Sequence, residues 1–169
     1  GPAIGRELKS KSITAIIVLL FAIVMYIAFV FRKLSASLSP WAMGAAAIAA
    51  MVHDVLIPMG LFAYLGRFYG IEITAVFIAG ALTILGYSIS DSVVVFDRVR
   101  ENMLRFGKSE NFAGTVHKSI LQTLVRSINT TVTTILALLA IFFFGGESIK
   151  YFSLALIVGI ISGSYSSIF

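Results

Sequence analysis

Apolar residues dominate five stretches of this chain, and each stretch is long enough to cross a bilayer as one helix. A spanning helix needs about 20 consecutive, mostly apolar residues. The stretches are 12–31, 40–65, 73–96, 120–145 and 151–169, with short polar or charged segments between them. The pattern predicts an all-α fold: a polytopic membrane helix bundle with five transmembrane helices.

Composition agrees with this class and argues against others. Hydrophobic residues make up 59% of the 169 residues and charged residues 12%, and the mean hydropathy is +0.99. A water-soluble domain of this size cannot bury so much apolar surface, so the lipid bilayer is the expected surrounding. The chain has no cysteine, and we find no phosphate-binding loop or nucleophile motif. We expect no enzymatic activity, no metal and no cofactor other than protons as the coupling ion.

The basic residues predict topology rather than binding to nucleic acid. The net charge of +5 comes from Lys and Arg that lie almost wholly between the apolar stretches. Segments 32–39 and 97–118 carry two and five basic residues, whereas 66–72 and 145–150 carry one each. Basic loops stay in the cytoplasm, so we expect residue 1 outside and residue 169 in the cytoplasm.

The charged segment 97–119 has a helical pattern of its own. Glu101 and Arg105 form an i,i+4 pair in the favourable order. Ser109 is a plausible helix start, and Phe112, Val116 and Ile120 then fall on one stripe. The segment predicts a cytoplasmic helical hairpin. This hairpin is either a solvated, charged connection between two spans or a docking site for a partner.

One acid and one base stand alone inside two apolar spans. Asp91 is the sole charge in 73–96, and Arg126 is the sole charge in 120–145. An intramembrane charge is costly and usually functional. Both lie six residues from the same predicted membrane face, roughly 9 Å deep, so neighbouring antiparallel helices could bring them together. We expect a proton relay in which Arg126 holds Asp91 ionised; a static ion pair that orders the bundle is the alternative.

His53 and Asp54 lie near the middle of span 40–65, shortly before Pro58, which should kink the helix. Neighbouring side chains on a helix point about 100° apart, so these two should not face one site squarely. Asp54 is either a hydrogen-bonded structural acid or a participant in the proton path. His53 is interpreted as structural, and no metal site can be argued.

Small and hydroxyl-bearing residues indicate where helices meet. Gly159 and Gly163 form a GxxxG motif, which lets two helices approach closely. A group of threonines gives span 120–145 a hydroxyl face that either solvates a buried ion or satisfies the helix's own carbonyls. Its members are Thr130, Thr131, Thr133 and Thr134.

Taken together, these motifs resemble the SecF family of the bacterial SecDF protein-export complex, within the resistance-nodulation-division superfamily. The resemblance covers essentially the whole chain. The motifs that carry it are Gly1–Leu8, His53-Asp54, Gly86–Ser92, Val95–Asn102, Gln122-Thr123-Leu124, Arg126, Thr130-Thr131 and Gly159–Ser167. The run GYSISDS followed by VFDRVREN is the most specific of them.

The resemblance implies a six-helix subunit in the bacterial cytoplasmic (inner) membrane. The five spans would be its second to sixth helices, with the first helix and a large extracytoplasmic domain absent from this fragment. Implied partners are SecD, the SecYEG translocon and, through the absent domain, the preprotein substrate. The family's membrane acid and arginine match Asp91 and Arg126, and the implied function is proton-driven assistance of protein export. A proton-coupled small-molecule exporter and a non-conducting structural assembly subunit remain alternatives.

Overall fold

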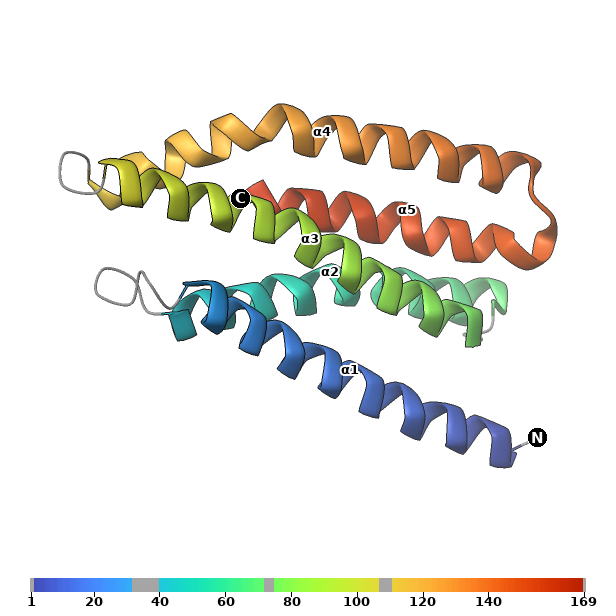
Figure 1. Cartoon of the computed structure of the whole chain (residues 1–169). Coiled ribbons are helices and arrows are strands. Elements are labelled where there is room, and N and C mark those ends of the chain that lie inside the picture. Colours follow the sequence, from blue (N-terminus) through green and yellow to red (C-terminus); the bar gives the residue numbers. More distant parts are fainter. Residues whose placement is uncertain (1, 32–39, 72–74, 107–110, 169) are drawn as a thin grey trace.

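Each predicted span corresponds to one long helix in the described part of the chain. The computed structural model describes residues 2–31, 40–71, 75–106 and 111–168 (Figure 1). All five helices are long and apolar enough to cross a membrane, which confirms the predicted all-α, polytopic fold. They are α1 (Pro2–Phe31), α2 (Pro40–Tyr69), α3 (Ala75–Phe106), α4 (Phe112–Phe144) and α5 (Glu147–Ile168).

The charged segment between the third and fourth spans is built from their own helices. α3 continues to Phe106 and α4 already begins at Phe112, so the predicted hairpin is an extension of two spanning helices. The expected pair of Glu101 and Arg105 is present at 3.8 Å, and Glu101 also accepts from Arg98 at 2.7 Å. Pairs of this spacing support a helix after its apolar residues end.

The start of α4 is fixed by a cap. The Asn111 side chain accepts a hydrogen bond of 2.7 Å from the Gly114 backbone N–H, which satisfies one of the free donors of the first turn. Ser109, the predicted start, lies outside the described residues. Phe112, Val116 and Ile120 line one apolar groove, as their spacing predicts.

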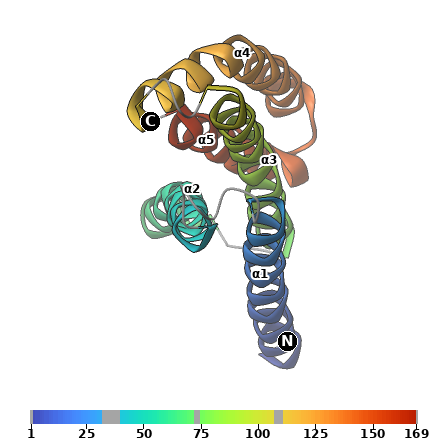
Figure 2. The same ribbon diagram turned by 60° about the vertical axis from the view of Figure 1, so that its left-hand side comes forward.

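α5 is the central helix of the bundle. It packs against α2, α3 and α4, whereas α1 contacts only α2 and α3 to any extent. In both views, the N-terminal end of α1 diverges from the other helices (Figures 1 and 2). The core is therefore organised around the helix that carries the GxxxG motif.

The glycines of α5 give α3 close access. A Cβ added at Gly159 would overlap the side chain of Ile84, and one added at Gly163 would lie 3.2 Å from the Ser88 Cβ. Ile84 and Ser88 are one turn apart on α3, so the two helices run parallel with matched spacing. The prediction that these glycines serve helix packing is confirmed.

The inner face of α4 is made of hydroxyls. Its apolar residues Leu121, Val125 and Val132 point outward, with 49–68% of each exposed. This arrangement suits a helix whose outer face meets lipid. The buried hydroxyl residues recur every fourth position: Thr115, Ser119, Thr123, Ser127 and Thr131.

The predicted threonine face therefore divides. Thr131 faces the bundle, whereas Thr130 and Thr133 are exposed and Thr134 is half-buried. These three donate to backbone carbonyls of α4 itself. These three threonines therefore satisfy carbonyls of their own helix rather than solvate a buried ion, which were the two predicted alternatives. In α2, Pro58 is buried, and the helix is assigned without a break from Pro40 to Tyr69.

Candidate functional site

Asp91 lies where three helices meet. It is half-buried on α3, and its Oδ2 accepts a hydrogen bond of 2.5 Å from Ser127 Oγ of α4 and another of 2.5 Å from Ser167 Oγ of α5. Hydroxyl donors of this kind stabilise an ionised carboxylate by short, charge-assisted bonds. Through these two bonds, Asp91 joins α4 and α5 to α3.

Arg126 does not make the expected ion pair with Asp91. It directly precedes Ser127 on α4, and neighbouring helical side chains diverge by about 100°. Because Ser127 faces Asp91, the Arg126 side chain is turned away from Asp91 and is exposed. In the described part of the chain, no ion pair joins its guanidinium to an acidic residue. Asp91 meets the turn of α4 that its depth predicts. The rotation of α4 about its axis, however, turns Ser127 rather than Arg126 toward the carboxylate.

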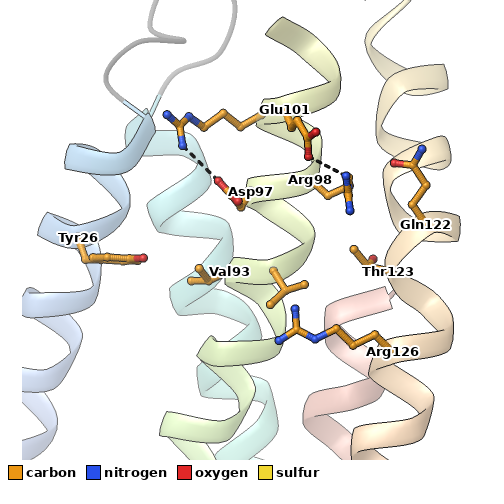
Figure 3. A pocket seen from close by; sticks show the side chains of 10 residues that line it. Tyr26, Val93, Asp97, Arg98, Glu101, Gln122, Thr123 and Arg126 are labelled. Atoms are coloured by element: carbon orange, nitrogen blue, oxygen red, sulfur yellow. Dashed lines mark hydrogen bonds and ion pairs between the residues drawn. The ribbon is translucent and has the colours of Figure 1, made fainter. Parts of the chain in front are cut away.

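Arg126 instead lines a polar cleft of about 430 Å³ between α1, α3 and α4. Figure 3 shows its side chain extending from α4 toward α3. Tyr26 closes the cleft on the α1 side, and acidic and basic groups of α3 lie at its upper end, including the ion pair of Arg98 with Glu101. Arg126 thus lies in a cleft on the outer surface of α3, the helix that carries Asp91.

Asp54 is the more completely enclosed of the two acids, with 0% of its surface exposed. Its Oδ2 accepts from Ser88 Oγ of α3 at 2.5 Å and from Ser166 Oγ of α5 at 2.7 Å. Its Oδ1 accepts from Ser162 Oγ of α5 at 3.2 Å. A buried acid with these partners ties α2 to both α3 and α5.

His53 completes the surroundings of Asp54. Its Nδ1 lies 3.0 Å from Asp54 Oδ1, although 47% of the imidazole side chain is exposed. The two neighbouring side chains are therefore in contact, although only Asp54 is enclosed by the bundle. His53 connects a fully enclosed acid to the outer face of the helix.

The serines at the end of α5 are not among the predicted site residues, yet Ser166 and Ser167 bind Asp54 and Asp91 respectively. Ser164 bonds to Thr131, which is itself 3.3 Å from the Tyr87 hydroxyl. The available signal was a cluster of hydroxyls at the end of an apolar span in a chain with two intramembrane acids.

The fold and this site define a multi-pass membrane helix bundle whose buried acids are held by hydroxyls from neighbouring helices. The chain belongs to the family described as "Protein export membrane protein SecD/SecF, C-terminal", whose model matches residues 1–169. This confirms the resemblance drawn from the sequence motifs.

Similar proteins and a solved structure agree with this family membership. The chain is 54% identical to the protein translocase subunit SecF of Thermobaculum terrenum, over 100% of this chain and 52% of that protein. It is 44% identical to the protein translocase subunit SecDF of Thermus thermophilus, over 100% and 21% respectively. A crystal structure of SecDF in a super-membrane-facing form superposes with a TM-score of 0.83 at 42% identity, covering 96% of this chain and 20% of that one. The chain spans about half the length of the SecF relatives, 52% of the protein from Thermobaculum terrenum.

Proposed function

We propose that this chain forms the membrane part of a SecF subunit that uses the proton-motive force to assist preprotein translocation across the bacterial cytoplasmic membrane. Family membership supports the role in export. The observation that carries the coupling is Asp91, a half-buried carboxylate inside a spanning helix that bonds to hydroxyls of two other helices. A titratable group at such a junction links its charge to helix packing.

The coupling follows from the two hydrogen bonds. Ionised Asp91 accepts from Ser127 and Ser167 and draws α4 and α5 toward α3. A proton on the carboxylate removes the charge that makes both bonds strong. The junction then loosens, and the bundle shifts between two arrangements, as a switch of this kind requires. Arg126 supplies a positive potential from the cleft rather than by contact.

The partners follow from the relatives. The relative from Thermus thermophilus is named SecDF, so its name joins SecD and SecF in one protein. This supports SecD as the partner of this chain. We place the SecYEG translocon and the preprotein as further partners of the whole subunit. In this role the chain is a transport subunit rather than an enzyme, with protons as its coupling ion.

The first test fixes Asp91 in its neutral form. In the intact protein, Asp91→Asn preserves the shape of the side chain but cannot ionise, so we expect normal membrane insertion and loss of proton-driven export. Export is measured as preprotein translocation in cells that contain only the variant, at matched protein levels. Ser164→Ala removes one interhelical hydroxyl contact without touching an acid and serves as the control. Normal export by Asp91→Asn contradicts the proposal.

A further inference from the structure

The serines that bind the two acids fall into two groups. In the described structure, the hydroxyls of Ser88, Ser127 and Ser162 donate to a carboxylate and to no other acceptor. The hydroxyls of Ser166 and Ser167 each lie within hydrogen-bond distance of two acceptors. These two serines are consecutive on α5, and each serves a different acid.

The second acceptor is a carbonyl of α5 itself. Ser166 Oγ lies 2.7 Å from Asp54 Oδ2 and 3.1 Å from the Gly163 carbonyl oxygen. Ser167 Oγ lies 2.5 Å from Asp91 Oδ2 and 3.0 Å from the Ser164 carbonyl oxygen. A hydroxyl carries one hydrogen and donates to one acceptor at a time. Both choices are available without a change of rotamer.

The charge of the acid decides the choice. An ionised carboxylate is the stronger acceptor and takes the serine hydrogen. A protonated carboxyl group has an O–H that can donate to the serine oxygen. The serine hydrogen then rotates to the backbone carbonyl, so the direction of the hydrogen bond reverses. The carboxylate gains one proton from hydronium, which becomes water, and no protein group other than the acid changes its charge.

We propose that Ser166 and Ser167 are positioning residues that register the protonation of Asp54 and Asp91 and transmit it to α5. The inference rests on the proposed function, in which Asp91 changes protonation, and it extends the same change to Asp54. With both acids ionised, two charge-assisted bonds tie the end of α5 to α2 and α3. With both protonated, these bonds are neutral and reversed, and the end of α5 is held less tightly.

In the described structure, the contacts that both acids make with other helices are serine hydroxyls, so these hydroxyls are the groups that can respond to a change in protonation. Among the described residues, Asp54 contacts one titratable group, His53 on its own helix, and its hydrogen-bond partners from α3 and α5 are all serines. Asp91 meets serines of α4 and α5. The nearby Tyr87 bonds to Thr131 instead, and Arg126 lines the cleft.

Hydrogen exchange of the segment 160–168 tests the coupling in the intact protein, reconstituted in lipid nanodiscs and read by mass spectrometry. We compare wild type, Asp91→Asn, Ser167→Ala and the double variant. A hydrogen bond to a charged group is worth about 1.5–3 kcal/mol, and about 1.4 kcal/mol is a factor of ten, so each single variant should raise exchange roughly 10- to 150-fold. The double variant should exchange no faster than the faster single variant, because both changes remove the same charged contact.

Ser164→Ala is the matched control, since Ser164 lies on the same stretch of α5 but bonds to the neutral Thr131. Its effect should add to that of Asp91→Asn. Additive effects of Ser167→Ala and Asp91→Asn would overturn the inference.

An isosteric pair keeps the test valid if Ser167→Ala does not insert. Ser167→Thr retains the hydroxyl and should keep exchange sensitive to Asp91→Asn, whereas Ser167→Val should abolish that sensitivity. Equal behaviour of Thr and Val would also overturn the inference. Normal export by Asp91→Asn together with non-additive exchange would contradict the proposed function alone and support the role of Ser167.

Discussion

At the scale of single residues, the two intramembrane acids differ in enclosure and in the number of donors they receive. Asp54 is fully buried and has four side-chain partners, three serines and His53. Asp91 is half-buried and receives two serines. An acid with four partners from three helices is suited to holding the bundle together, whereas an acid with two donors and partial exposure can exchange a proton more readily.

Asp54→Asn should therefore lower stability more than Asp91→Asn does. The new amide would point a donor at serine hydroxyls that already donate, which leaves buried groups unsatisfied at a cost of about 1–3 kcal/mol. We expect a lower thermal unfolding midpoint for the purified protein and reduced, but not abolished, export. Asp91→Asn at equal protein level is the comparison. A stable Asp54→Asn protein that exports as poorly as Asp91→Asn would place Asp54 in the obligatory proton path.

Arg126 provides a separate prediction, because it acts from the cleft and not by an ion pair. Arg126→Lys keeps the positive charge but loses the planar guanidinium. We expect export below wild type and above Arg126→Ala, measured in cells that contain only the variant. Arg105→Ala is the control, since that side chain is 68% exposed and its ion pair is long, at 3.8 Å. Equal export by wild type, Arg126→Lys and Arg126→Ala would remove Arg126 from the mechanism.

At the scale of elements, the contact between α3 and α5 depends on the absence of a side chain at Gly159. Gly159→Ala places a Cβ against Ile84, and overpacking of this kind costs about 1–3 kcal/mol. We expect a lower unfolding midpoint, part of which Ile84→Val should recover by removing the terminal methyl group. Gly86→Ala is the matched control on α3, where nothing lies within 4 Å of an added Cβ. Similar midpoints for the two alanine variants would show that the contact tolerates more separation.

The loose attachment of α1 is the second feature at this scale. α1 lacks extensive contact with α4 and α5. Only 11% of its most apolar stretch, within Ser10–Phe29, is buried, against 44% of the corresponding stretch of α5 within Ile149–Ile168. Its outer face is therefore available to lipid or to another protein chain. The helix that carries both switching serines is, by contrast, the one most enclosed by its neighbours, so a change at its end reaches three helices at once.

At the scale of the whole molecule, the orientation in the membrane is the property to test. The end of the bundle at which α3 ends and α4 begins lies opposite the end at which α4 ends and α5 begins (Figure 1). Leu104 is 62% exposed near the first, and Glu147 begins α5 near the second. In a cysteine-free background, an impermeant thiol reagent outside intact cells should label Glu147→Cys and spare Leu104→Cys. Permeabilised cells, in which both sites should react, are the control, and the reverse pattern would invert the topology.

The sequence alone determined the helices and their axial order. Hydropathy and a rise of about 1.5 Å per residue place each side chain at a depth, so the five spans and the common level of Asp91 and the α4 turn that binds it were predictable. The small residues of Gly159 and Gly163 also predicted a close helix contact, because only such residues let backbones approach.

Only the tertiary structure decided the rotation of each helix about its axis. That rotation follows from the packing of all five helices together, which no single span encodes. It turns Ser127 toward Asp91 and Arg126 into the cleft, folds His53 back onto Asp54, and places consecutive serines of α5 on two different acids. The depth of a side chain depends only on its position along its own helix. Its contact partner at that depth depends on how the neighbouring helices pack against it.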